Sequence, residues 1–551
     1  MFHSKFSQNL KFNTQMKNIF KNSFALLIAL LVFGCHKIEV PVNTQLTPDI
    51  FPQTAAQFVQ ASGPPYAALR GNFSLDYWFI QTLTTDEAIL PARGGNWYDN
   101  RGYIDMHYHS WTKDHGATGS CWNWLSTVIG TTNQALSILE TTIPESTTTK
   151  SQNLSELKMV RAFAYFMMMD LYGNVPIYDK YGDFTPKANS TRAEVFKFVE
   201  SEIKAAIPNL SSDVNVATYG RFTKWGAYAL LAKMYLNAEV YTGTAMNKEC
   251  IDACDAVINS AKFGVESSAN YLKMFYPDNG PQMKEFIFAI PYDPAATAMS
   301  GTNGFMYHSR YDVPRSMRTR YNLPFTPSAP RSTLPEFYAY FNDPNDIRNQ
   351  QWLTGKQFLA DGKTPLTVTT TKKGYDQFYT GADGNASVTY QVELTPEIKL
   401  RQDVTTFDLG NDEIAWNMGY RNIKFYPDAT STSRNQNNDI PVFRYSDIIL
   451  MKAEATLRSG GSAQTATSLV NQVRSNRTTS AALTNVTLED IYQERSREFT
   501  METWHRNDMI RFGKYENSWG FKKDTDKNKR IFPIPTGALV LNPALKQNPG
   551  Y

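Results

Sequence analysis

The chain has 551 residues, with 55 lysines and arginines against 52 aspartates and glutamates, and 13% of its residues are aromatic. This nearly balanced charge lacks the basic surface of a nucleic-acid binder, so no nucleic-acid partner is expected. A chain of this length exceeds what one hydrophobic core usually organises, which predicts two domains or one elongated repeat body.

Residues 1–34 are predicted to be an export signal. Lys17 and Lys21 precede an apolar run from Phe24 to Phe33, and this run is too short to remain in a bilayer as a spanning helix. The following segment, Val32-Phe33-Gly34-Cys35, resembles a bacterial lipobox, in which a small residue precedes the lipidated cysteine. We therefore expect acyl chains such as palmitate on Cys35; the alternative is ordinary secretion with cleavage nearby.

Cysteine and histidine show no metal-binding pattern. Cys121, Cys250 and Cys254 remain after lipidation, and the last two lie four residues apart on a predicted helix with no histidine nearby. They are expected to be buried core residues rather than a disulfide framework or metal ligands. Three of the seven histidines fall close together: His107, His109 and His115. They match no metal signature, so no metal or other cofactor is expected.

Helical pairs are predicted from about residue 120 to residue 261. Apolar residues recur at helical spacing over 122–139 and over 157–171, which gives each segment one apolar face. Residues 191–194 have the pattern of a capping box and open a third helix. Small and large apolar residues alternate over 223–241, as in one helix of a tetratricopeptide pair.

The middle of the chain has little regular pattern. Clusters of Pro, Gly, Asn and Asp replace helical spacing between about 280 and 439, and one strand is predicted over 388–394. A long irregular stretch of this kind is usually functional. Helices are predicted again over 445–459, 463–476 and 488–512. We expect the mature chain to form one continuous body with two regions, 35–280 and 281–551. The second region is predicted to be irregular over 281–440 and helical over 441–515, and it ends in a tail.

Several distinctive blocks follow one another along the chain. They are TTDE from Thr84, SELKMVRAFAYFMMMDLYGNVP from Ser155, RFTKWGAYALLAKMYL from Arg221, RYSDIILMKAEA from Arg444, ERSREFTMETWHRNDMIR from Glu494 and IFPIPTGALVLNPALKQNPGY at the end. In sequence, order and spacing these blocks resemble the SusD/RagB family of nutrient-binding outer-membrane lipoproteins from Bacteroidota, and together they span nearly all of the mature chain.

The resemblance implies a mainly α-helical fold, with four tetratricopeptide-like helix pairs on one side and irregular loops with a few short strands on the other. It also implies a non-enzymatic lipoprotein that is anchored in the outer membrane and faces the cell exterior. Such a protein captures oligosaccharides and delivers them to its partner, a SusC-like TonB-dependent transporter. A peptide-binding protein of the same fold is the first alternative, and an all-helical glycoside hydrolase is the second.

Residues 90–111 form the candidate glycan-binding loop. Sugars need an aromatic platform beside planar polar groups on a preformed loop, and this segment contains both. In starch-binding members of the family the loop after the matching Thr-Asp-Glu supplies stacking aromatics, so the resemblance points to the same stretch here. The expected ligand-binding residues are Arg93, Asn96, Trp97, Tyr98 and Asp99, completed from the opposite side by Tyr307, Arg310 and Tyr311. The alternative is that these aromatics are buried against neighbouring helices.

Acidic and basic residues alternate at helical spacing in the predicted helix over 488–512. Three pairs lie three or four residues apart: Glu494 with Arg497, Glu502 with Arg506, and Asp508 with Arg511. A cationic neighbour lowers the pKa of a carboxyl group and removes it as a general acid. The pattern therefore predicts a structural ion-pair network rather than a glycosidase acid and nucleophile.

Overall fold

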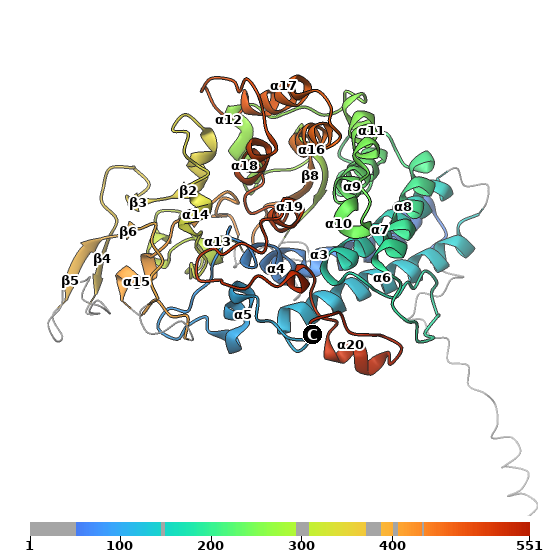
Figure 1. Ribbon diagram of the computed structural model, residues 1–551, viewed down its shortest axis with the longest axis horizontal. Coiled ribbons are helices and arrows are strands. Elements are labelled where there is room, and N and C mark those ends of the chain that lie inside the picture. Colours follow the sequence, from blue (N-terminus) through green and yellow to red (C-terminus); the bar gives the residue numbers. More distant parts are fainter. Residues whose placement is uncertain are drawn as a thin grey trace, which may run out of the picture. The chain divides into compact units, whose positions relative to one another are not determined.

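Helices dominate the regular structure, which confirms the mainly α expectation (Figure 1). The computed structural model describes residues 51–144, 149–293, 308–370, 387–400, 406–410, 412–431 and 435–551. The α-helices are α2 (Ala55–Ala61), α3 (Gly63–Asn72), α4 (Trp78–Leu83), α5 (Gly102–Tyr108), α6 (Gly116–Thr142), α7 (Lys150–Tyr172), α8 (Arg192–Ala206), α9 (Lys224–Leu236), α10 (Ala238–Thr242), α11 (Asn247–Ile258), α12 (Ser268–Tyr271), α13 (His308–Asp312), α14 (Pro335–Tyr338), α15 (Glu413–Asn417), α16 (Tyr445–Arg458), α17 (Ala463–Arg474), α18 (Leu488–Glu498), α19 (His505–Arg511) and α20 (Thr536–Leu541).

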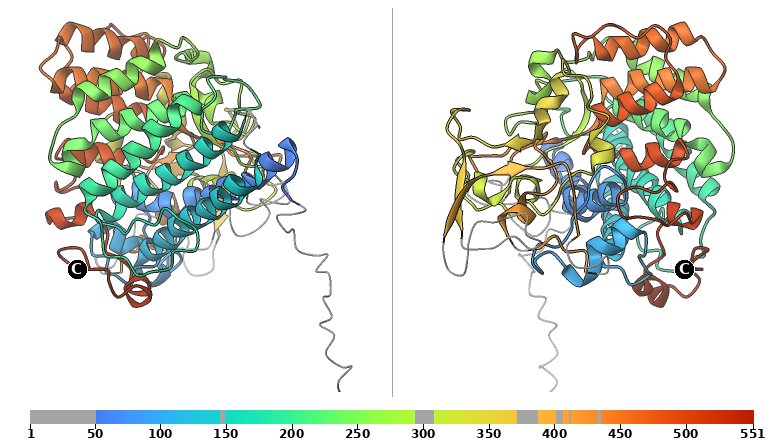
Figure 2. Two further views of the ribbon diagram at one scale, coloured as in Figure 1. Left: turned by 90° about the vertical axis from the view of Figure 1, so that its right-hand side faces the viewer. Right: turned by 60° about the vertical axis from the view of Figure 1, so that its left-hand side comes forward.

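The long helices pack in layers, as the left view of Figure 2 shows. Helix α7 packs between α6 and α8, α11 packs between α9 and α16, and α16 also contacts α17. From Leu157 to Tyr172, α7 is buried nearly all round, as expected of a helix enclosed by others. The predicted capping box is present, since Thr191 accepts a hydrogen bond from the backbone N–H of Glu194 at the start of α8.

The strands form short antiparallel pairs in the described part of the chain. β1 (Phe286–Ile290) pairs with β8 (Ile440–Arg444), and both strands are fully buried. The remaining pairs are β2 (Trp352–Leu353) with β7 (Arg421–Asn422), β3 (Gly355–Lys356) with β6 (Glu393–Leu394), and β4 (Thr367–Thr370) with β5 (Val388–Gln391). The strand predicted over 388–394 is thus two strands, β5 and β6, with different partners.

The helix predicted over 488–512 is interrupted, and this prediction was wrong. α18 ends at Glu498 and α19 begins at His505, with Met501 and Thr503 at φ angles of 59° and 68° between them. The interruption is stabilised from the N-terminal part of the chain. Met501 donates its backbone N–H to Glu87 Oε1 at 2.5 Å, and His505 Nε2 lies 2.6 Å from a carboxylate oxygen of Asp86.

This break also changes the ion pairs. The pairs of Glu494 with Arg497 and of Asp508 with Arg511 form at 2.8 and 2.6 Å. The pair expected between Glu502 and Arg506 does not form, because the break lies between α18 and α19. Glu502 instead pairs with Lys424 and Arg444, and Arg506 pairs with Asp170.

Glu494 and Glu498 are held in the ionised state. Burial alone would raise the pKa of Glu494, but Arg348 and Arg497 beside it hold that pKa at about 2. Glu498 lies against Arg477 and Arg444, which hold its pKa well below the usual range in spite of burial. A carboxyl group with such a pKa cannot serve as a general acid near neutral pH.

Residues 52–551 form one unit by their contacts. The boundary that we placed at residue 280 remains a prediction. Among the described helices, none combines the length and the apolar character needed to cross a bilayer.

Replacing Glu87 by Gln should change how stability depends on pH. Burial raises the pKa of Glu87 to about 7 from its ordinary 4.5, so the folded state holds the proton more tightly than the unfolded state does. The wild type should therefore lose stability relative to Glu87→Gln as pH rises from about 4.5 to about 7, by up to about 3 kcal/mol. The measurement is urea unfolding of both proteins at pH 5, 6 and 8.

The matched control is Glu249→Gln on the exposed side of α11. Its difference from the wild type should be the same at each pH. A difference for Glu87→Gln that also stays constant would show that Glu87 is not a buried titrating group.

Candidate functional site

A strained turn forms the tip of the candidate loop. Four residues other than glycine have positive φ: Trp97 (67°), Asp99 (41°), Asn100 (50°) and Arg101 (69°). This left-handed region is sterically unfavourable for residues with a Cβ atom, and it is most unfavourable for bulky ones such as tryptophan. Strain of this kind persists only where the surroundings impose it, and it clusters at binding and active sites.

The base of the loop is held by polar contacts. The backbone N–H groups of Gly94 and Gly95 each donate to the carboxylate of Asp408 at 2.8 Å, and Gly410 donates to the same carboxylate at 2.7 Å. The guanidinium of Arg93 donates to Ser332 Oγ at 3.0 Å and to the carbonyl oxygen of Ala415. These contacts impose the strained conformation on the residues that follow.

Arg93 was expected to contact ligand, but the structure places it in the interior. Its exposed fraction is 0%, and its acceptors include carbonyl oxygens of Pro330 and Met418. Arg93 therefore acts on any ligand only through the loop that it supports.

A hollow of about 640 Å³ lies beside the strained turn. Its lining combines side chains from the loop with side chains from three later segments: Asn96, Trp97, Asp99, Arg310, Arg315, Thr326, Pro327, Ser328 and Trp416. The structure thus brings together four of the residues expected to bind ligand, Asn96, Trp97, Asp99 and Arg310. This volume falls in the range of small-molecule sites.

Each tryptophan of the hollow carries an arginine over its ring. The guanidinium carbon of Arg310 lies 5.4 Å from the ring centroid of Trp97, and that of Arg315 lies 4.3 Å from the centroid of Trp416. Trp97 also makes an edge contact with Tyr311, with ring centroids 5.5 Å apart. Arg315 pairs with Glu413 at 3.2 Å. Trp97 is therefore partly packed and only partly presented to solvent.

The other expected site residues do not line this hollow. Tyr98 lies on the same turn with 40% of its surface exposed, and Tyr311 is buried beside Trp97. Tyr307 and Cys35 lie outside the described residues, so their roles remain predictions.

Five lining residues were missed by the sequence reasoning: Arg315, Thr326, Pro327, Ser328 and Trp416. Trp416 lies on the short helix α15, which Asp412 caps by accepting the backbone N–H of Ala415, and Arg315 follows Pro314 at the start of a single 3-10 turn. The available signal was an aromatic residue within an Asn-rich and Asp-rich irregular stretch. Nothing in the sequence linked that stretch to the loop more than 300 residues earlier.

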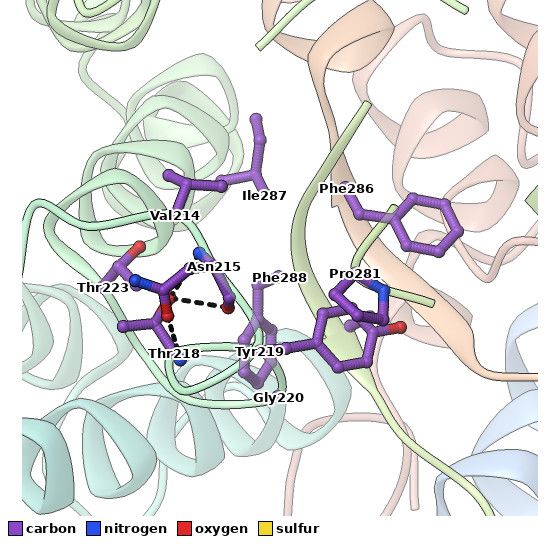
Figure 3. Close-up of a pocket in the computed structure, with 11 residues that line it drawn as sticks. Val214, Asn215, Thr218, Tyr219, Gly220, Thr223, Pro281, Phe286, Ile287 and Phe288 are labelled. Carbon is purple, nitrogen blue, oxygen red and sulfur yellow. Dashed lines mark hydrogen bonds between the residues drawn. The ribbon is translucent and has the colours of Figure 1, made fainter. Parts of the chain in front are cut away.

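Other hollows are weaker candidates. The one in Figure 3, between residues 214–223 and β1, has a volume of about 30 Å³, which is room for one water molecule. An apolar groove of about 610 Å³ runs along α6 beside Tyr181 and Phe184. Neither of these hollows borders the strained turn.

Among the described residues, His107 and His109 make structural contacts, and Cys250 and Cys254 are packed in the interior. His107 accepts the backbone N–H of Phe521, and His109 Nε2 lies 3.0 Å from the carbonyl oxygen of Thr84. Cys250 and Cys254 are free and buried, as predicted. Within the described ranges, no group of three or more His, Cys, Asp or Glu is placed to hold a metal ion.

Comparisons with known proteins agree with this architecture. Residues 284–551 match the family model described as "SusD family", and residues 74–236 match one described as "Starch-binding associating with outer membrane". The starch-binding protein SusD of Bacteroides thetaiotaomicron is 23% identical over 486 residues, which cover 85% of this chain and 84% of that protein.

Two solved structures have the same fold. Surface glycan-binding protein A from Bacteroides uniformis superposes with a TM-score of 0.65 at 19% identity, covering 90% of this chain and 99% of that one. A structure described as a laminarin binding SusD-like protein superposes with a TM-score of 0.66 at 20% identity, covering 91% and 100%.

Substitutions at Asn100 should report the strain of the turn. Asn100 is exposed at φ 50°, a conformation that glycine adopts freely and a β-branched residue does not. We expect Asn100→Gly to be neutral or slightly stabilising and Asn100→Val to lower the free energy of unfolding by about 1–2 kcal/mol. Thermal and urea unfolding of both variants check this.

Asn209 supplies the control, since it is also exposed but is not among the residues with positive φ. The Asn209→Gly variant should be no more stable than the Asn209→Val variant. The same order of the two variants at both positions would mean that the turn is not strained.

Proposed function

Because this chain belongs to the SusD-like family, we propose that it captures oligosaccharides in the hollow lined by Trp97 and Trp416. Members of this family are binding proteins, so the chain is not an enzyme. The buried, arginine-paired carboxylates of α18 and α19 agree with this, because none of those described above is available as a general acid.

The observation that carries the proposal is the meeting of the strained turn with residues 310–328 and 416 around one hollow. Aromatic rings, amide and hydroxyl groups and guanidinium groups converge there from separate segments. This combination suits the flat C–H faces and hydroxyl edges of sugars. A loop fixed before binding also loses little conformational entropy when the ligand arrives.

Delivery and location form the second part of the proposal. The bound oligosaccharide passes to a SusC-like TonB-dependent transporter in the outer membrane, and acyl chains on Cys35 hold the protein at the cell exterior. The description of the matching family model, with its association with the outer membrane, supports this placement. The lipobox-like segment before Cys35 supports the anchor.

Trp97→Ala should weaken oligosaccharide binding by roughly ten- to a hundredfold. Loss of one large aromatic contact removes on the order of 1–3 kcal/mol of binding free energy. The loss of fold stability should be small, because the ring is only partly buried. Its replacement also leaves the polar contacts at the base of the loop in place. Calorimetric titration beside thermal unfolding measures the two effects separately.

Phe184→Ala is the matched control, since that ring is 84% exposed and lines the groove along α6. It should leave binding unchanged. Loss of binding in Phe184→Ala with full binding in Trp97→Ala would move the site to that groove. Long incubation with bound glycan should give no new reducing ends in any of the proteins.

Cys35→Ser should leave the protein folded and release it from the membrane. Acyl chains at this position are the proposed anchor, and two or more such chains hold a protein stably on a bilayer. Fractionation of cells that lack the transporter checks this. The proposal of a lipid anchor falls if the variant stays in the membrane pellet.

A further inference from the structure

Two arginine–tryptophan pairs face the same hollow. Arg310 comes from α13 and lies over Trp97, while Arg315 comes from the turn after Pro314 and lies over Trp416. A guanidinium that lies over an aromatic ring is restricted in orientation, and its planar arrangement of N–H donors suits bidentate binding of an oxyanion.

Each arginine covers one face of its tryptophan ring. Arg310 lies over Trp97 and also 5.6 Å from the ring centroid of Tyr311, and Arg315 lies over Trp416. A sugar can then stack only on the face that remains uncovered. The rings also position two cationic groups at the wall of the hollow.

The formal charge of the lining is positive. Arg310 and Arg315 are its cations, and Asp99 is its carboxylate. Glu413, which is not part of the lining, is paired with Arg315. Beyond the strained turn, a second hollow of about 500 Å³ shares Asp99 and is lined by three further aspartates: Asp76, Asp105 and Asp114.

We propose that this site selects oligosaccharides that carry an anionic group, either a uronate carboxylate or a sulfate ester, and that Arg310 and Arg315 bind that group. The inference rests on the proposed function and names its substrate class. The acidic second hollow repels an anionic group, so the charged sugar lies on the arginine side of the turn and less charged parts of the chain extend past it.

The test compares charged ligands with uncharged forms of the same backbone. Oligogalacturonides are titrated beside their methyl esters, and sulfated galacto-oligosaccharides beside their desulfated forms. We expect at least one charged ligand to bind at least about tenfold more tightly than its uncharged form, with this advantage falling as NaCl rises from about 50 to about 500 mM. The pair that shows the advantage identifies carboxylate or sulfate as the recognised group.

Variants assign the effect to the arginines. Arg310→Met and Arg315→Met should each remove most of the charged ligand's advantage, and Asp99→Asn should increase it. Arg320→Met is the matched control, because Arg320 also lies over a ring, that of Tyr321 at 5.4 Å, but does not line the hollow. Thermal unfolding shows whether each variant is folded. If an arginine variant is not folded, Asp99→Asn still tests the proposal.

Two outcomes distinguish failure of the anionic selection from failure of the proposed function. If uncharged oligosaccharides bind as tightly as charged ones and Asp99→Asn changes neither affinity, the proposed selection is wrong while glycan binding stands. If neither the charged nor the uncharged members of the panel bind, the proposed function itself falls.

Discussion

Buried ion pairs around Glu498 tie together segments that are far apart in the sequence. Its carboxylate contacts Arg444 at 3.0 Å, Arg477 at 2.9 Å and Arg348 at 3.1 Å, and Glu285 completes the group by pairing with Arg444 and Arg477. Loss of one member would leave a buried charge without compensation, at a cost of about 3–5 kcal/mol. The end of α18, the β1–β8 pair and the segments at Arg348 and Arg477 therefore depend on a single set of charges.

A second set of polar contacts fixes the geometry of the candidate site. Asp408 and Arg93 hold the base of the loop, and Glu87 holds the break between α18 and α19 at the other end of the same segment. Because these groups are buried and bonded to backbone, they restrict the turn at Trp97 to a conformation that it would not adopt alone. The strain of the turn is thus balanced by contacts elsewhere in the fold.

Sequence patterns predicted the structural features that are set by residues close to one another in the chain. The apolar face of α6, the capping box at Thr191 and the local pair of Glu494 with Arg497 all follow from spacing alone. The spacing in α7 predicted one apolar face, but tertiary packing buries that helix nearly all round. The break after Glu498 did not, because the group that stabilises it, Glu87, lies about 400 residues away. Long-range partners of this kind leave no periodic signal in a single sequence.

The same distinction explains where the structure places the residues of the loop. Residues 93–99 were selected by composition and by resemblance, and four of the expected residues meet at one hollow. Their individual positions depend on contacts that spacing does not reveal. Arg93 lies in the interior because its acceptors are carbonyl oxygens near residues 330 and 415. Trp416 was missed because its place at the hollow is set by tertiary packing of an irregular stretch.

The left-handed turn also limits how the proposed binding surface can change over evolutionary time. At Trp97, Asp99, Asn100 and Arg101 a random substitution meets a backbone that few side chains tolerate, whereas residues 326–328, in another part of the lining, have no positive φ. Substitutions should therefore accumulate slowly in the turn and more freely in that other part. New ligand preferences would arise mainly by exchange at residues 326–328, while the constrained turn is inherited nearly unchanged.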